Sequence, residues 1–516
     1  MWSPCDLVFD LDPTENPAQA TLQAEFKSPR HRTYLLHAFQ DGPRRLVIRF
    51  SPTEAGDWEY KLTSNLPRLN DQEAKFSAAS SEAPGFIHVA NVHHFQAANG
   101  KPHLWMATAL DKFASISSAE FDSQLEQRSK EKFTHLRVTL EPGTDLRESA
   151  ERVKAINAKG LIADLVLASI PADGRERYLN DLVSRFAALN ISWAGLPAFE
   201  EVAQGRPELK ADYALIRQFD PYQHPRTSMA RATSGPLATD GWLDILSYGT
   251  VDANVGSVEH QFYQLPAVNT AIQSRADLWN ATMNGQYPSS GSGAYMTAWI
   301  DFMSGNRYWE LEPYFDLEGG RAVALDGTEY VVYLEKPGAV DVTVEKHSYD
   351  VFWINPATGE EIKGKKFNAE HFMGEPPDKS HDWLLHLTRE GHKAGLSSYR
   401  FASLTIPTPE IETNPEKIPF DVDTPAEGSI SVKNPPYFAL KIKKDTHGTR
   451  SIRVEWTGEV TIAGQGYRVI GQGKEGTFQI PANLVDRYPA TLAVRVLILN
   501  ANGKAYELDR VYRLTE

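Results

Sequence analysis

Residues 135–140 (HLRVTL), 145–158 (DLRESAERVKAINA) and 161–167 (LIADLVL) form the stretch that decides the fold. The first and third segments are short apolar runs typical of buried strands, whereas the middle segment repeats its apolar residues with the period of a helix. Two parallel strands need a crossover connection between them, and this is usually a helix. The stretch therefore predicts one β–α–β unit of a parallel sheet.

The same alternation continues on both sides of this unit. A strand at 104–107 and a helix over 118–132 precede it, and a helix over 174–189 follows it; further strands are expected at 191–196, 224–228, 242–247 and 265–269, with a last unit near 290–317. No Gly-x-Gly-x-x-Gly turn follows the first strand, which favours a closed barrel over an open dinucleotide-binding sheet. We expect a (β/α)8 TIM barrel over residues 89–318.

Short alternating runs flank the predicted barrel. RLVIRF (45–50) and WEYKL (58–62), separated by turn clusters, indicate a β-sandwich over 1–88, and EYVVYL (329–334) with YDVFWI (349–354) indicate another over 319–410. Residues 411–428 are rich in proline and acidic residues and are expected to be a linker, and 429–516 to be an Ig-like sandwich. The prediction is a multidomain chain: a (β/α)8 TIM barrel flanked by an N-terminal β-sandwich and two C-terminal β-domains.

The charge balance narrows the range of partners. The 516 residues include 67 acidic and 53 basic side chains, for a net charge of −14, and a field of that sign repels nucleic acid. No apolar run approaches the length of a membrane span, so we expect no membrane span. A single cysteine, Cys5, excludes an internal disulfide. We expect an exported protein, periplasmic or extracellular, whose signal peptide is absent from this chain; the sequence assigns no oligomeric state.

Candidate site residues follow from the barrel prediction, because barrel active sites lie at the carboxyl ends of the strands. Carboxylates are expected there, together with aromatic rings on the late strands and their loops. Carboxylates can protonate and attack an acetal, and flat rings stack on sugar faces, so we expect carbohydrate, an oligosaccharide or a polysaccharide, as the ligand. The carboxylates are Asp111, Glu141, Glu200, Glu201 and Asp252, and the rings are Trp242, Tyr248, Trp279, Tyr287, Tyr295 and Trp299.

Several segments resemble the apiosidase-like glycoside hydrolases. AFQDG (38–42) and AGDWEY (55–60) are similar to the sandwich that precedes those barrels, and FDPYQHP (219–225) and LPAVN (265–269) resemble two barrel landmarks. WINPATGE (353–360) resembles the following β-domain, which is often labelled collagen-binding. The resemblance covers residues 1 to about 410, and it implies hydrolysis of a glycosidic bond.

The resemblance also assigns the catalytic positions. The acid/base falls on Glu200, with Phe199 in place of the family's asparagine, and the strand-seven nucleophile falls on Ala271, which cannot attack a sugar. A retaining mechanism needs two carboxyl groups. Three alternatives follow: another carboxylate, Asp252 or Glu141, substitutes for the nucleophile, or the reaction is inverting, or the barrel is inactive.

Alternatives remain open at this point. Each carboxylate could be a hydrated loop side chain, and each ring could pack between the barrel and its helices. The chain could then be a non-catalytic carbohydrate-binding protein, or an adhesion or scaffold protein whose β-modules carry the function. His88, His93 and His94 have no carboxylate at a metal-ligand spacing. We therefore expect no metal and no cofactor.

Overall fold

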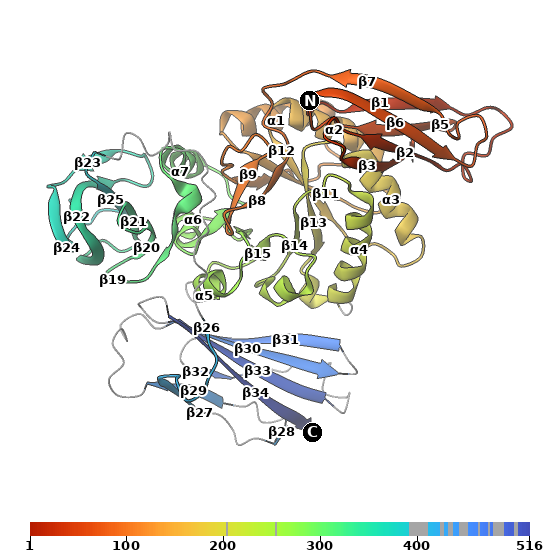
Figure 1. The fold of residues 1–516 in the computed structure, drawn as a ribbon. Helices are drawn as coiled ribbons and strands as arrows, with labels where there is room; N and C mark the ends of the chain where they lie inside the picture. The colour runs from red at the N-terminus through yellow and green to blue at the C-terminus, as the bar shows by residue number, and fades with distance from the viewer. Residues whose placement is uncertain are drawn as a thin grey trace.

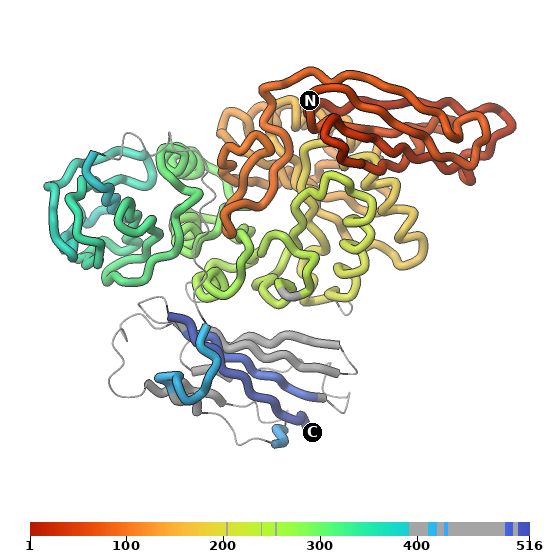
Figure 2. Tube along the Cα trace, viewed as in Figure 1, coloured from red at the N-terminus to blue at the C-terminus, as the bar shows by residue number. Residues whose placement is uncertain are grey.

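The computed structural model describes residues 1–202, 205–252, 255–391, 411–423, 428–431, 437–442, 453–462, 465–472, 475–477, 490–499 and 504–515. A central α/β unit has β-rich units around it: strands of the first 80 residues on one side, the teal β-domain on another and the blue C-terminal strands below (Figure 1). The two chain ends lie on opposite sides of the central unit (Figure 2). The chain is thus multidomain, with several β-sheets and a parallel α/β part.

The N-terminal unit consists of two antiparallel sheets, with strand orders β1-β5-β4 and β3-β2-β6-β7. Phe26 and Phe50 stack between the sheets with ring centroids 4.0 Å apart, and Trp58 is only 1% exposed. A hairpin of β8 and β9 then leads into the central unit. The bounds are β1 Cys5–Asp10, β2 Leu22–Lys27, β3 Thr33–His37, β4 Phe39–Gln40, β5 Arg45–Phe50, β6 Gly56–Ser64, β7 Glu73–Ala78, β8 Ile87–Ala90 and β9 His94–Ala97.

The central unit contains eight strands within the described residues, β10–β17, in two parallel sheets of order β10-β11-β12-β13-β14 and β15-β16-β17. An isolated parallel bridge between Thr227 and Ile245 connects the two sheets. The bounds are β10 Ala107–Ala109, β11 His135–Leu140, β12 Ile162–Leu167, β13 Ile191–Pro197, β14 Arg226–Met229, β15 Leu246–Tyr248, β16 Ala267–Asn269 and β17 Gln286–Pro288.

Helices follow most of these strands, and several begin at a capping side chain. Ser117 accepts the Glu120 N–H at the start of α1, and Asp145 accepts two N–H groups at the start of α2. Such caps satisfy backbone donors that the first turn leaves without partners. The bounds are α1 Ser118–Lys130, α2 Leu146–Ala158, α3 Arg175–Phe186, η1 Phe199–Glu201, α4 Gly205–Phe219, η2 Gly235–Asp240, α5 Val255–Phe262, α6 Arg275–Thr282, α7 Ala294–Ser304 and η3 Tyr308–Glu310.

The next β-domain packs directly on α6 and α7. Its sheet has the order β18-β20-β21-β25-β22-β19, with β23 and β24 also paired to β22, and it begins at Glu312, before the expected boundary at residue 319. Trp279 of α6 lies beside Tyr333, and Phe302 of α7 beside His386. The bounds are β18 Glu312–Tyr314, β19 Leu317–Glu318, β20 Arg321–Leu325, β21 Glu329–Leu334, β22 Val340–Ile354, β23 Glu361–Lys363, β24 Phe367–Gly374 and β25 Trp383–Arg389. Residues 392–410, also assigned to this domain by the sequence, lie outside the described residues.

The expected linker at 411–428 contributes strands to the C-terminal sheets. Within it, β26 pairs with β34 and β27 pairs with β29. Phe420, the first residue of β27, is buried, which gives this proline-containing stretch an apolar anchor. The bounds are β26 Ile411–Glu412, β27 Phe420–Asp423, β28 Ser429–Ser431, β29 Tyr437–Ile442, β30 Arg453–Ile462, β31 Gln465–Gln472, β32 Glu475–Thr477, β33 Ala490–Leu499 and β34 Ala505–Thr515.

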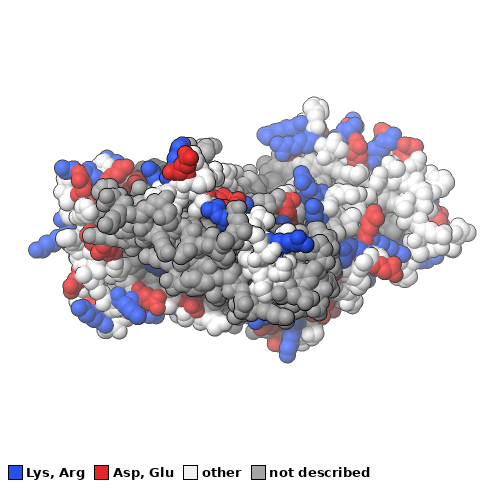
Figure 3. Space-filling model, turned by 90° about the horizontal axis from the view of Figure 1, so that it is seen from below, with Lys and Arg blue, Asp and Glu red and all other residues white. Residues whose placement is uncertain are grey.

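The described surface carries both signs of charge. Lysine and arginine are interspersed with aspartate and glutamate over the described part of the face in Figure 3. Among the helices in the described part of the chain, none has both the length and the apolar character needed to cross a bilayer.

Candidate active site

Glu200 lies just after the fourth parallel strand, β13. Ala198, with φ of 51°, turns the chain into η1, which carries the exposed Glu200. The Arg231 N–H donates to both carboxylate oxygens at 3.0 Å, and the Ala232 N–H donates to Oε1 at 3.2 Å. Both donors follow β14. Glu200 therefore joins the loops that leave the carboxyl ends of two neighbouring strands.

Glu201, the next residue, makes a surface ion pair. Its carboxylate lies 2.7 Å from Arg231 Nη1, and the two side chains are 55% and 71% exposed. Exposed pairs of this kind contribute about 0–1 kcal/mol to stability. Glu201 is thus an exposed glutamate in an ordinary surface ion pair, and as the neighbour of Glu200 it serves as a matched control for that residue.

Asp252 follows the sixth strand, β15, and starts a helix. Its Oδ1 accepts the Val255 N–H of α5 at 2.6 Å, and its carbonyl oxygen accepts Asn284 Nδ2 at 2.7 Å. Arg321 is close enough to interact electrostatically: burial lowers the pKa of its guanidinium to about 10, and the Asp252 charge opposes that shift. Asp252 therefore lies beside α5 and within electrostatic range of Arg321 in β20.

Two further carboxylates lie at the ends of the first two parallel strands. Asp111 follows β10 and Glu141 follows β11, and both side chains are exposed. A tight turn holds the Glu141 backbone, since its N–H donates to Thr144 Oγ1 and its carbonyl accepts the Thr144 N–H. Both residues are therefore at the same edge of the sheet as Glu200.

Ala271 lies two residues beyond the seventh strand, β16. Asn269, the last residue of that strand, is fully buried; its Oδ1 accepts the Ala271 N–H and its Nδ2 donates to Gln286 and to the Thr250 carbonyl. The end of the seventh strand thus presents a methyl group and a fully bonded amide rather than a carboxylate.

The predicted sugar-stacking rings are mostly packed on protein. Trp242 stacks on Tyr213 at 4.7 Å, the Tyr248 hydroxyl donates to Glu259, and Trp299 Nε1 donates to Thr282 Oγ1. A ring whose faces already contact side chains offers no face to a sugar. Trp242, Tyr248, Trp279, Tyr287 and Trp299 are each at most 5% exposed, and Tyr295 is partly buried.

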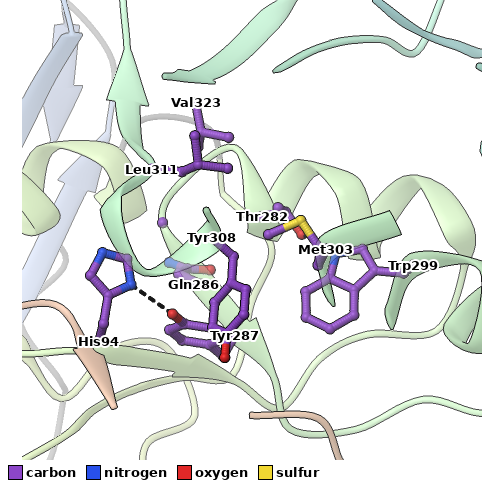
Figure 4. A pocket seen from close by; sticks show the side chains of 10 residues that line it. His94, Thr282, Gln286, Tyr287, Trp299, Met303, Tyr308, Leu311 and Val323 are labelled. Atoms are coloured by element: carbon purple, nitrogen blue, oxygen red, sulfur yellow. Dashed lines mark hydrogen bonds between the residues drawn. The ribbon is translucent and has the colours of Figure 1, made fainter. Parts of the chain in front are cut away.

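A small cavity lies at β17, beside two of these rings. It measures about 20 Å³ and is lined by His94, Tyr287, Trp299, Tyr308 and other side chains. His94 Nδ1 and the Tyr287 hydroxyl lie 2.6 Å apart at its edge (Figure 4). A volume of this size accommodates a water molecule but not a sugar ring.

A buried polar network crosses the interior of the central unit. Arg137 of β11 donates from Nε to Asp164 Oδ2 of β12 at 2.9 Å and from Nη2 to Ser289 Oγ at 2.5 Å. Ser192 of β13 donates to the other Asp164 oxygen at 3.0 Å, and Trp105 Nε1 also donates to Ser289. The network brings the residue after β17 next to the second strand. Sequence reasoning missed it, although an arginine and an aspartate inside apolar strand runs were the available signal.

A buried carboxylate, Glu259 of α5, supports the loop that holds Glu200. It is 0% exposed and accepts hydrogen bonds from Thr233 Oγ1 at 2.5 Å and from the Tyr248 hydroxyl at 2.9 Å. Thr233 belongs to the same loop as the two N–H donors of Glu200. Two carboxylates, Glu200 and Glu259, thus accept hydrogen bonds from the loop after β14. Glu259 was not among the predicted site residues.

Comparison with known proteins agrees with this fold. Residues 1–65 match a family described as a domain of unknown function (DUF5060). None of the curated proteins matches the chain. A solved structure of a candidate glycoside hydrolase from Bacteroides vulgatus ATCC 8482 is similar at 16% identity with a TM-score of 0.64, covering 75% of this chain and 98% of that one.

Two further solved structures share the fold. One, named glycoside hydrolase, is 14% identical with a TM-score of 0.52 and covers 60% of this chain and 99% of its own. The other, a glycoside hydrolase family 5 protein from Bacteroides vulgatus ATCC 8482, is 13% identical with a TM-score of 0.51, covering 62% and 98%. The chain therefore has a glycoside hydrolase-like fold; identities this low establish the fold alone.

Proposed function

We propose that β10–β17 close into a (β/α)8 barrel and that the protein hydrolyses a glycosidic bond of an oligosaccharide or polysaccharide at the carboxyl ends of these strands. The observation that carries the proposal is the position of Glu200, an exposed carboxylate at the end of the fourth parallel strand of a glycoside hydrolase-like fold. The contact of Arg137 with Ser289 supports closure, because it connects the second strand to the end of the eighth. Kinship with the apiosidase-like family, and export to reach polysaccharide, belong to the same proposal.

Glu200 serves as the proton donor to the leaving sugar oxygen in this proposal. Its backbone N–H partners hold the carboxyl group between two loops, so the group is positioned before substrate arrives. Fixed geometry of this kind lowers the entropy cost of reaching the reactive arrangement. Glu259 acts as a positioning residue, because it fixes the same loop through Thr233.

The second carboxylate activates water in an inverting reaction, since Ala271 leaves the nucleophile position of a retaining reaction without a carboxyl group. Of the two predicted candidates, Glu141 is exposed at the end of β11, whereas one oxygen of Asp252 accepts the N–H of Val255 at the start of α5. We therefore place Glu141 ahead of Asp252 in this role.

A second candidate function is carbohydrate binding without hydrolysis. It is favoured by one specific observation: the seventh strand ends in a fully bonded Asn269 followed by Ala271. A barrel that lost its nucleophile could retain the cleft and the sugar contacts. The third hypothesis is an adhesion or scaffold role of the β-domains, and no contact in the described residues favours it.

The test compares Glu200→Gln with Glu201→Gln on a panel of aryl glycosides and polysaccharides. The amide oxygen of Glu200→Gln can still accept the Arg231 and Ala232 N–H groups at the Oε1 position, while the contact at Oε2 and proton donation are lost. We expect wild type and Glu201→Gln to release product at similar rates and Glu200→Gln to be slower by about 10²–10⁴-fold. Calorimetry should show affinity for oligosaccharide within a few-fold in all three proteins.

Two other outcomes would contradict hydrolysis. Polysaccharide binding by all three proteins with no product from any of them would establish the binding protein instead. Neither binding nor product across the panel would remove both candidates and leave the scaffold reading.

A further inference from the structure

Three side chains from distant parts of the sequence converge at the junction of the central unit and the β-domain. His93 precedes β9, His260 lies in α5, and Glu312 begins β18. His93 and His260 are 9% and 1% exposed at the side chain, and Glu312 is 18% exposed. The junction is therefore a partly closed, largely dry environment in which ionisable groups need partners.

The two rings point at one carboxylate oxygen. His93 Nδ1 lies 3.0 Å from Glu312 Oε2, and His260 Nε2 contacts the same oxygen. The ring centroids of the two histidines are 3.9 Å apart. One nitrogen from each ring and one carboxylate oxygen all lie within 4.8 Å of one another.

The other ring nitrogen of His93 fixes where its proton is. His93 Nε2 lies 3.0 Å from the Tyr263 carbonyl oxygen, which can only accept a hydrogen bond, so Nε2 carries the proton. In the ring form that binds a metal, with the proton on Nε2, the Nδ1 lone pair points at the carboxylate oxygen. A cation between Nδ1 and Oε2 holds the two atoms together: a proton in the metal-free protein, and the metal ion once it displaces that proton.

A fourth residue orients the carboxylate. His94 Nε2 lies 3.1 Å from the other Glu312 oxygen, Oε1, while its Nδ1 meets the Tyr287 hydroxyl. With the hydroxyl donating to Nδ1, Nε2 donates to Oε1. Metal-binding carboxylates commonly have outer partners of this kind, which hold the ligand oxygen in place.

We propose that His93 Nδ1, His260 Nε2 and Glu312 Oε2 bind a divalent transition-metal ion of the Zn²⁺ class. Two imidazole nitrogens and one carboxylate oxygen are a zinc-type ligand set, and oxygen-seeking ions such as Mg²⁺ and Ca²⁺ disfavour it. The ion connects the hairpin before β10, helix α5 and the first strand of the β-domain. None of its ligands belongs to the loops that hold Glu200, so metal binding can be measured without any reference to activity.

The experiment measures metal bound to the full chain. Protein stripped with EDTA is dialysed against excess Zn²⁺, and bound metal is counted by mass spectrometry. We expect one Zn²⁺ per chain in the wild type and at least a tenfold loss of affinity in His260→Ala and in Glu312→Gln. His94→Phe, which removes the outer partner of Glu312, should weaken binding by about 10–100-fold.

His88→Gln is the matched control, because His88 lies in the same hairpin and its ring contacts Gln96. It should bind Zn²⁺ as the wild type does, and Zn²⁺ should raise the unfolding temperature of both proteins but not of Glu312→Gln. Wild type that takes up no Zn²⁺, or folded His260→Ala that binds it unchanged, would overturn the proposal.

A measurement on the wild type alone covers the case in which the ligand variants do not fold. Co²⁺ occupies zinc sites and reports its coordination through visible absorption. Intense bands typical of four- or five-coordinate Co²⁺, removed by competing Zn²⁺, would support the site. A spectrum like that of hydrated Co²⁺ would refute it.

Discussion

The buried pair of Arg137 and Asp164 offers the sharpest test of how the central unit is held together. The two side chains are 6% and 0% exposed, and they form a 2.9 Å contact. Asp164→Asn keeps the shape of the side chain but leaves the guanidinium buried without its counter-ion. Removing one partner of a buried pair costs about 3–5 kcal/mol of unfolding free energy. The amide oxygen can still accept from Arg137 Nε, so we expect about 3 kcal/mol.

The double variant Arg137→Met/Asp164→Leu separates the cost of an unpaired buried charge from the cost of the lost hydrogen bonds. It removes both charges at once, so no buried charge remains. The Ser192 and Ser289 hydroxyls each lose an acceptor or donor, at about 1 kcal/mol apiece. The double variant should therefore lose only about 2 kcal/mol, less than Asp164→Asn.

Thermal and urea unfolding followed by fluorescence and circular dichroism would measure these changes. For a domain of this size, 3 kcal/mol corresponds to a fall of about 6–12 °C in the unfolding temperature of the affected transition. Glu201→Gln, which breaks an exposed pair, is the control and should shift it by less than about 3 °C. The reasoning is refuted if Asp164→Asn is as stable as the wild type, or if the double variant is less stable than Asp164→Asn.

Three further predictions concern other parts of the chain. Ala271→Glu should lower any wild-type turnover of an aryl glycoside by adding a charge to an inverting site, and a gain in turnover would show instead that the barrel lacks only its nucleophile. Burial raises the pKa of Asp212 from 3.8 to about 6 despite the opposing charge of Arg175, so the contribution of Asp212 to stability falls as the pH rises through about 4–6. The unfolding temperature of Asp212→Asn relative to wild type should therefore be higher at pH 8 than at pH 3.5, and equal differences at both pH values would contradict this. Trp279→Ala removes a ring that is 1% exposed and lies beside Phe302 and Tyr333. Urea unfolding should show that the free energy of unfolding falls by about 3–5 kcal/mol. A fall of less than about 1 kcal/mol would mean that the contact between α6 and the β-domain contributes little to stability.

The local elements could be predicted because they depend on a few neighbouring residues. HLRVTL became β11 at the expected bounds, and DLRESAERVKAINA became α2 with Asp145 as its cap. Apolar periodicity and capping both act within about one or two turns of chain. The alternation of such units along the sequence was enough to predict a parallel α/β part flanked by β-rich units.

Part of the candidate site was also readable from the chain. Glu200 could be assigned to the end of the fourth strand because chain order gives strand order, but its partners Arg231 and Ala232 could not, since they belong to the next loop. The aromatic residues show the limit most clearly. The residue type alone does not distinguish a tryptophan that stacks on a sugar from a tryptophan that packs in a core. Only the tertiary structure shows that Trp242 and Trp279 are both buried.

Sequence alone thus determined the order of strands and helices, the acidic charge and the alanine after the seventh strand. Tertiary structure decided which polar groups meet. Glu312 contacts His93 across 219 positions and His260 across 52, and Arg137 reaches Ser289 across 152. Local periodicity carries no information about contacts over such separations, because they depend on how whole elements pack and bring their side chains to one point.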